Sequence, residues 1–350
     1  MATKKPKLST LLPPIIIGGA VYNTQMNLDP STLPVRSILT KAFSMGIYCI
    51  DTSPYYGPSE LLMGDALTQP AITQSYPRSS YIIMTKAGRI SESEFDYSPN
   101  WIRKSVRRSC ERLHTDYLDV VFCHDVEFVS PDQVMGAVRT LFELVDEGRV
   151  RYVGISGYPH KLLAELAVRV RQELGRPLDA VQSYCHMNLQ NSTLLQSINK
   201  LKGEGGVDTV VNSSPLGMKL LTGEFPGSFH PAPKGLRDAC ARAAELCKAR
   251  GETLPRVAMR WVFANWKGAT LTGVSYLEEL EDNIGAYMDV AVSTEEDKEG
   301  KVVWKDVDER KVKRWEPLWE GVQEILGEWK DYSWDSPPRD WMLGKGQSML

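Results

Sequence analysis

Residues 99–123, PNWIRKSVRRSCERLHTDYLDVVFC, contain the two patterns that decide the fold. In the first part, Ile102, Val106, Cys110 and Leu113 recur every three or four positions, with basic residues between them. This spacing predicts a helix with one apolar face, and Pro99 suits its first turn. Residues 117–123 are a short run of apolar, β-branched and aromatic residues, which predicts a buried strand. A helix followed by a buried strand is the repeating unit of parallel α/β folds.

The same alternation extends along the chain in both directions. Pro131 suits the first turn of another helix, and Gly148 stands just past its end. A doubly wound sheet also fits such alternation, but it would normally carry G-x-G-x-x-G after its first strand, and that motif is absent. We therefore predict a single (β/α)8 TIM barrel over residues 15–290, of class α/β. Its eight predicted strands are residues 15–17, 48–51, 81–86, 117–123, 150–155, 180–183, 209–212 and 269–274.

The predicted barrel is flanked by an N-terminal tail, residues 1–14, and by a C-terminal extension, residues 291–350. The extension begins with a charged stretch, 295–313, continues as a predicted helix to about Trp329, and contains six of the nine tryptophans. We expect this helical, Trp-rich extension to pack on the barrel through aromatic burial. An alternative is that part of it covers a pocket.

Composition excludes several classes of protein. The 350 residues are 42% hydrophobic and 24% charged with a net charge of −3, so no basic excess attracts nucleic acid or anionic lipid. No apolar run reaches the roughly 18 residues of a membrane span, and residues 15–17 are too short for a signal peptide. The six cysteines include no C-x-x-C, and the five histidines show no metal-binding spacing. We expect a cytoplasmic, metal-free monomer or weak dimer acting on a small molecule.

Polar residues end three neighbouring predicted strands, where the reactive groups of such barrels collect. Asp51 ends the second strand and Tyr56 follows it, Lys86 ends the third, and His124 follows the fourth. A phenol, with a pKa of about 10, needs a nearby cation to act as a base at neutral pH. Lys86 could lower the pKa of Tyr56, Asp51 could hold Lys86 charged, and His124 could bind the substrate oxygen. The set indicates proton transfer.

The run DTSPYYGPSE, residues 51–60, resembles the signature D-T-[AS]-x-x-Y-G of the aldo-keto reductase superfamily. The resemblance covers residues 15–290 and implies that Asp51, Tyr56, Lys86 and His124 are the catalytic tetrad. The stretches RRSCERLHTDYLD, HDVEF, GISGYP and LQN resemble the sugar 1-dehydrogenases of that superfamily. This implies NAD⁺-dependent oxidation of the C1 hemiacetal of a free aldose to a lactone, toward ascorbate-type products, with Tyr56 as general base. D-Arabinose is the expected substrate, and L-galactose and L-fucose are alternatives.

The resemblance also implies a cofactor site, with three departures from the family pattern. Gly157 replaces an asparagine, Ser213 replaces an aromatic residue that stacks on the nicotinamide, and Glu279 replaces an arginine that binds the 2′-phosphate of NADP. A carboxylate repels that phosphate and accepts a hydrogen bond from a free 2′-hydroxyl, so Glu279 favours NAD. The implied cofactor-binding residues are Ser156, Gln182, Ser213, Pro215, Leu216, Gly273, Ser275, Glu279, Asp282 and Asn283.

Two other functions stay open at this point. One is an NAD(P)H-dependent reductase of aldehydes such as pyridoxal. Glu279 argues against NADPH as its cofactor but does not argue against NADH. The other is a nucleotide-sensing subunit without activity, which the intact tetrad disfavours.

Overall fold

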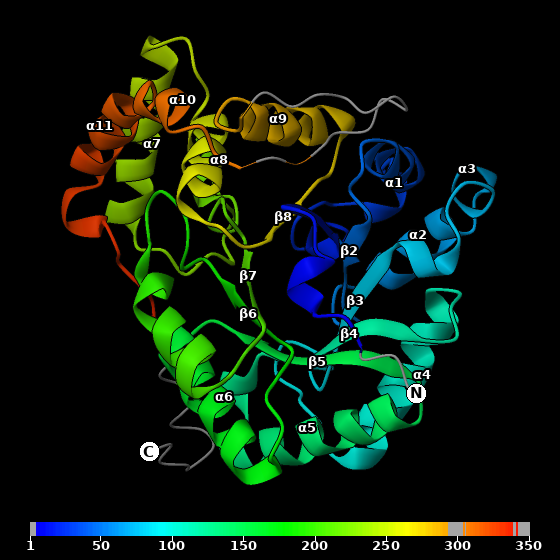
Figure 1. Cartoon of the computed structure of the whole chain (residues 1–350). Helices are drawn as coiled ribbons and strands as arrows, with labels where there is room; N and C mark the ends of the chain where they lie inside the picture. The colour runs from blue at the N-terminus through cyan, green and yellow to red at the C-terminus, as the bar shows by residue number, and fades with distance from the viewer. Residues whose placement is uncertain (1–4, 293–303, 305, 339–340, 342–350) are drawn as a thin grey trace.

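The structure, a computed structural model, describes residues 5–292, 304, 306–338 and 341. Eight parallel strands form a closed barrel in chain order, and β1 pairs with β8 to complete it (Figure 1). The predicted fold class is confirmed, and every predicted strand is present within one or two residues of its expected bounds. The strands are β1 Ile15–Gly18, β2 Cys49–Asp51, β3 Ile82–Ala87, β4 Leu118–His124, β5 Val150–Gly157, β6 Ala180–Tyr184, β7 Thr209–Ser213 and β8 Thr270–Gly273.

Helices surround the strands as an outer ring (Figure 1). Pro99 and Pro131 begin α4 and α5, as the sequence predicts, and each follows a serine that caps the helix. The chain between β6 and β7 forms only short helical turns at residues 193–204, where Gly203 and the glycines just after it disfavour a regular helix. The described helices are α1 Val35–Ser44, α2 Ser59–Leu67, α3 Pro70–Thr73, α4 Pro99–Arg112, α5 Pro131–Asp146, α6 His160–Leu174, α7 Lys234–Ala249, α8 Leu254–Asn265, α9 Leu277–Met288, α10 Glu309–Lys313 and α11 Glu316–Leu326.

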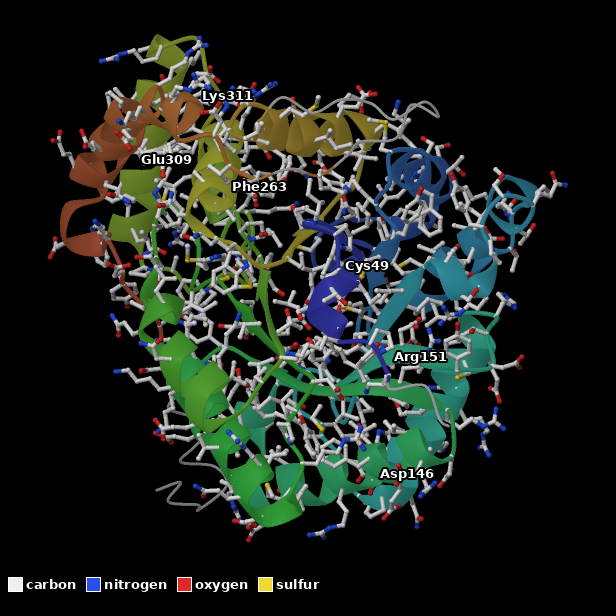
Figure 2. All side chains as sticks on the ribbon, in the orientation of Figure 1. Cys49, Asp146, Arg151, Phe263, Glu309 and Lys311 are labelled. Carbon is white, nitrogen blue, oxygen red and sulfur yellow. The ribbon has the colours of Figure 1, made fainter. Side chains whose placement is uncertain are left out.

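The inside of the barrel is packed with apolar side chains. Because successive strand residues point to opposite faces, alternate positions such as Val120 and Phe122 of β4 belong to a buried cluster inside the ring. Cys49 of β2, labelled in Figure 2, belongs to the same cluster. Gly154 makes room for this cluster, since a Cβ there would lie 2.5 Å from the Phe122 ring. The barrel is therefore a solid core, and a site can form only at its ends.

The N-terminal segment closes one of those ends. Leu8, in the 3₁₀ turn Leu8–Thr10, is 1% exposed and joins the inner cluster. Ser9 donates from its backbone N–H and its hydroxyl to Asp208, just before β7. These contacts cover the amino ends of the strands, so the carboxyl ends are left for function.

The C-terminal extension packs on the outside of the barrel. Helix α11 lies against α7 in Figure 1, and the Trp319 indole N–H donates to the backbone oxygen of Val257 in α8 at 3.1 Å. The Arg260 guanidinium carbon lies 3.6 Å from the ring centre of Trp315. Aromatic packing thus holds this helix, whereas the short helix α10 carries the exposed Glu309 and the partly exposed Lys311 (Figure 2).

Candidate active site

The inward-facing rows of the barrel change from apolar to polar at the carboxyl ends of the strands. His124 of β4 lies opposite Ser156 of β5, and Ser156 lies opposite Gln182 of β6. These residues continue the row in which Phe122 and Gly154 fill the interior. Parallel register thus brings side chains from distant parts of the sequence to one level of the barrel.

Asp51, Lys86, Tyr56 and His124 come together at this level. The Lys86 ammonium donates to the Asp51 carboxylate at 2.5 Å and to the backbone oxygen of Thr52 at 3.0 Å. Both charged side chains are 2% exposed, and the Lys86 nitrogen lies 4.9 Å from the ring centre of Tyr56. The Tyr56 hydroxyl is 3.5 Å from Nε2 of His124. The four predicted residues therefore form one connected cluster.

His124 is held as a neutral ring. Burial lowers the pKa of His124 to about 3; Lys86 and Arg89 act in the same direction, and Asp125 opposes them. Nδ1 of His124 lies 3.1 Å from the Ser53 hydroxyl, which can donate to it, and Nε2 lies 3.6 Å from the Asp125 carboxylate. With Nδ1 as the acceptor, Nε2 carries the proton, faces Tyr56 and can donate to a substrate oxygen.

Tyr56 departs from the sequence-based expectation. Burial raises the pKa of Tyr56 well above its ordinary value, and the negative charges of Asp51 and Asp125 add to the rise. The expectation that Lys86 brings the pKa of Tyr56 below its ordinary value is wrong for the protein alone, because burial and the two carboxylates outweigh the effect of this cation. The phenol is therefore protonated at neutral pH, and its phenolate is a minor form.

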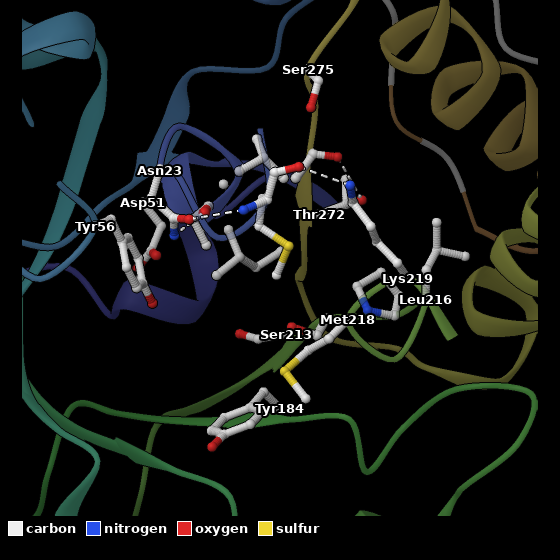
Figure 3. Close-up of a pocket in the computed structure, with 18 of the residues that line it drawn as sticks. Asn23, Asp51, Tyr56, Tyr184, Ser213, Leu216, Met218, Lys219, Thr272 and Ser275 are labelled. Carbon is white, nitrogen blue, oxygen red and sulfur yellow. Dashed lines mark hydrogen bonds between the residues drawn. The ribbon is translucent and has the colours of Figure 1, made fainter. Parts of the chain in front are cut away.

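A cavity of about 710 Å³ opens above this cluster. Figure 3 shows Tyr56 and Asp51 on one side of it, and Ser213, Leu216 and Lys219 on the other. All of the predicted tetrad and cofactor residues line this one cavity: Asp51, Tyr56, Lys86, His124, Ser156, Gln182, Ser213, Pro215, Leu216, Gly273, Ser275, Glu279, Asp282 and Asn283.

The donors and acceptors next to the tetrad fit a nicotinamide carboxamide. Gln182 donates from its amide nitrogen to the Ser213 hydroxyl at 2.8 Å, and its buried amide oxygen has no hydrogen-bond partner within the described chain. That oxygen can accept from a carboxamide NH₂. Glu127 fills the space that a side chain at position 157 would need, since a Cβ on Gly157 would lie 2.3 Å from a Glu127 carboxyl oxygen.

The far end of the cavity, at the start of α9, carries negative charge. The Glu279 carboxylate folds back and accepts from the backbone N–H of Ser275 at 2.6 Å. The backbone N–H of Ser275 is therefore not free to bind a phosphate, the group that helix starts commonly bind. Arg256 also lines this end, but it is paired with Asp282 at 3.4 Å and Asp289 at 3.1 Å.

Several cavity residues were not among those predicted. Tyr55, Arg89, Asp125 and Tyr184 line the side away from α9, and Lys219 crosses toward β1 to donate to the backbone oxygen of Met26 at 2.9 Å (Figure 3). The available signal was the position of Asp125, next to His124 at a strand end. Its φ of +57° is strained for a non-glycine residue, and such strain concentrates at functional sites.

The described residues of the C-terminal extension pack on the outer side of the cavity wall and do not line the cavity. Trp334 stacks on Tyr158 with ring centres 4.9 Å apart, and the Ser336 hydroxyl donates to Glu127 at 3.1 Å. Trp341 contacts the rings of Phe95 and Phe128. None of the described residues after 304 lines the cavity, so none of them supplies the stacking aromatic missing at Ser213.

Comparisons with known proteins agree with this geometry. Residues 14–301 match the model of the aldo/keto reductase family, and the chain belongs to that family, whose members are oxidoreductases that use nicotinamide cofactors. The chain is 43% identical over 273 residues to a D-arabinose 1-dehydrogenase of Saccharomyces cerevisiae, covering 77% of this chain and 81% of that protein. It is 38% identical over 250 residues to an L-galactose dehydrogenase of Arabidopsis thaliana, covering 70% and 75%.

A solved structure shows the same fold at lower sequence similarity. The glycerol dehydrogenase of Gluconobacter oxydans superposes with a TM-score of 0.61 at 22% identity, covering 97% of this chain and 99% of that one. Among the described residues there is no group of three or more His, Cys, Asp or Glu placed to hold a metal ion. No helix in the described ranges is long and apolar enough to cross a membrane.

Proposed function

We propose that this protein oxidises the C1 hemiacetal of a free aldose, D-arabinose first among the candidates, to the sugar lactone with NAD⁺. The observation that carries the proposal is the convergence of Asp51, Tyr56, Lys86 and His124 on one cavity with the implied cofactor residues. The D-arabinose and L-galactose dehydrogenases among its relatives support a sugar as substrate.

Each tetrad residue has a distinct role in this reaction. Tyr56, as its phenolate, takes the proton of the C1 hydroxyl while Nε2 of His124 donates to the same oxygen. The Lys86 ammonium, whose nitrogen lies 4.9 Å from the ring centre of Tyr56, stabilises the phenolate, and the contact with Asp51 holds Lys86 in place. NAD⁺, when bound, supplies the acceptor for the hydride that leaves C1. Gln182 and Ser213 orient its carboxamide end.

The preference for NAD rests on Glu279. Its carboxylate lies at the start of α9 with its bond to Ser275, and Glu278 adds a second negative charge in the first helical turn. A 2′-phosphate would meet repulsion there, whereas a 2′-hydroxyl could donate to the Glu279 carboxylate.

The six cysteines are all free, which supports a reducing, cytoplasmic location.

The raised pKa of Tyr56 supports one alternative, reduction of an aldehyde with NADH. A protonated phenol is the form that donates a proton to a carbonyl oxygen. The two directions separate by pH, because oxidation requires the phenolate and should become faster as pH rises, whereas reduction requires the phenol and should not.

The test is to follow NADH absorbance with purified protein offered D-arabinose, L-galactose, L-fucose and D-glucose, each with NAD⁺ or NADP⁺. We expect turnover of D-arabinose with NAD⁺ and little with NADP⁺. Activity with NADP⁺ alone would make the role given to Glu279 wrong. Consumption of NADH on aldehydes such as pyridoxal, with no sugar oxidised, would favour the reductase. No turnover in either direction would leave nucleotide sensing as the function to test.

A further inference from the structure

Three polar residues on the tetrad side of the cavity have no role in the function proposed so far. Arg89, after β3, donates from Nη1 to the Asp125 carboxylate after β4 and from Nη2 to the Tyr55 hydroxyl at 3.2 Å. Its guanidinium carbon also lies 4.0 Å from the ring centre of Tyr55. Arg89 therefore holds Asp125 and Tyr55 in fixed positions, since its fork restricts both partners.

Asp125 is a buried carboxylate with an unused acceptor. It is 4% exposed, and its Oδ2 is the oxygen that Arg89 contacts. In the described part of the chain, no residue donates a hydrogen bond to its Oδ1. Burial acts to raise the pKa of Asp125, but the charge and the hydrogen bond of Arg89 act against it, and that pKa lies below its ordinary value. Because Asp125 lines the cavity, a ligand hydroxyl bound there can donate to this oxygen.

The short distance between Asp125 and His124 places Asp125 next to the C1 end of a bound sugar. Its Oδ2 lies 3.6 Å from Nε2 of His124, the atom proposed to contact the reacting C1 oxygen. In an aldopyranose the atoms next to C1 are the ring oxygen and C2. The ring oxygen carries no proton and cannot donate to a carboxylate, whereas the C2 hydroxyl can.

We infer that Asp125, positioned by Arg89, accepts a hydrogen bond from the C2 hydroxyl of the aldose and selects substrates that carry it. The inference rests on the proposed sugar oxidation and extends it to the identity of a specificity residue. A site built to bind a hydroxyl discriminates strongly against the analogue that lacks it, because the buried acceptor is then left without a partner.

The test compares D-arabinose, its C2 epimer D-ribose, and 2-deoxy-D-ribose, which is the C2-deoxy form of both. In the wild-type protein we expect kcat/KM for 2-deoxy-D-ribose to be about 10- to 150-fold below that for D-arabinose, the range of one hydrogen bond to a charged group. Asp125→Asn suits the left-handed backbone at this position. It should lower kcat/KM for D-arabinose about tenfold or more and leave that for 2-deoxy-D-ribose nearly unchanged. D-Ribose shows whether the configuration at C2 is also recognised.

The control is Glu94→Gln, which removes a carboxylate from an exposed position on the same loop as Arg89 without touching the cavity. It should leave the ratio of the two kcat/KM values at the wild-type level. If Asp125→Asn does not fold, as judged by thermal unfolding, Arg89→Lys serves instead, since it keeps the charge but loses the fork that positions Asp125. Arg89→Lys should lower the ratio of kcat/KM for D-arabinose to kcat/KM for 2-deoxy-D-ribose.

Two outcomes overturn the inference, and they differ. Equal losses on D-arabinose and 2-deoxy-D-ribose would mean that Asp125 only positions His124. Oxidation of none of these sugars by the wild-type protein would make the proposed function wrong, and the inference would fall with it.

Discussion

Tyr56 is the single residue on which the proposed chemistry depends most. Its hydroxyl is the one proton-transferring group of the cluster that faces His124, at 3.5 Å, while Lys86 is bonded to Asp51 and Thr52. Its raised pKa follows from burial, which a sequence pattern does not reveal. A buried phenol next to a buried ammonium can exchange a proton with substrate without water entering the site.

We predict that Tyr56→Phe lowers kcat by about 10²- to 10⁴-fold, the usual contribution of acid–base catalysis. The ring stays, so packing against His124 is kept and NAD⁺ binding should be unchanged in titration calorimetry. Normal turnover in this variant would show that another group moves the proton.

At the scale of elements, the proposed preference for NAD rests on the start of α9. Glu279 accepts the hydrogen bond of the Ser275 backbone N–H, so a ligand meets a carboxylate at this helix start. A helix that binds phosphate has a free backbone N–H at this position. Arg256 nearby is already neutralised by Asp282 and Asp289.

Replacing the carboxylate with a cation should reverse the preference. For Glu279→Arg we expect the ratio of kcat/KM for NADP⁺ to that for NAD⁺ to rise by at least tenfold, about 1.4 kcal/mol, since repulsion of the 2′-phosphate becomes attraction. The neighbouring Glu278→Gln is the control, with a small effect expected. A ratio that does not change in Glu279→Arg would place the 2′-position elsewhere.

The segment after α11 is tied to the barrel through a buried carboxyl. Glu127 accepts from the backbone N–H of Tyr158 at 2.9 Å and from Ser336 at 3.1 Å, and its second oxygen has no partner within the described residues. Burial raises the pKa of Glu127 to about 8, and the charge of Asp125 adds to the rise. The folded protein thus keeps a proton that the unfolded chain has lost above about pH 4.5.

Stability should therefore depend on pH through this group. Between about pH 4.5 and 8 the folded state binds the extra proton, so the free energy of unfolding falls as pH rises, by at most about 1.4 kcal/mol per pH unit, and levels off above pH 8. Glu127→Gln lacks this term. Urea unfolding at pH 5, 7 and 9 should show the variant gaining stability relative to the wild type as pH rises. A difference independent of pH would mean that Glu127 is ionised when folded.

The same elements explain what could be predicted from sequence. Buried parallel strands are short apolar runs, so all eight could be located, and strand ends gave the tetrad. The role of Arg89 could not be predicted, because its partners Asp125 and Tyr55 lie on two other loops. The spacing of residues along the sequence does not give the positions of loops in space. The route of the segment after α11, past Tyr158 toward Phe95, likewise depends on tertiary contacts between distant residues.

For the whole molecule, the cavity joins parts of the chain that are far apart. It is lined by Gly18 and Asn23 near one end of the barrel sequence, by the central strands, and by Glu279 near the other end. No segment alone can bind the cofactor, so unfolding anywhere in the barrel should abolish the site. Binding and global stability are then linked by mass action.

Saturating cofactor should therefore raise the temperature of unfolding, with no need for a substrate. At 100 times its Kd, NAD⁺ adds about 2.7 kcal/mol to the free energy of unfolding, which corresponds to a rise of a few degrees in a protein of this size. NADP⁺ at the same concentration should give a smaller rise in the wild-type protein, and the order should reverse in Glu279→Arg. Equal rises with both nucleotides would mean that the negative charge at the start of α9 does not distinguish them. No rise with either would argue that the cavity holds a different ligand.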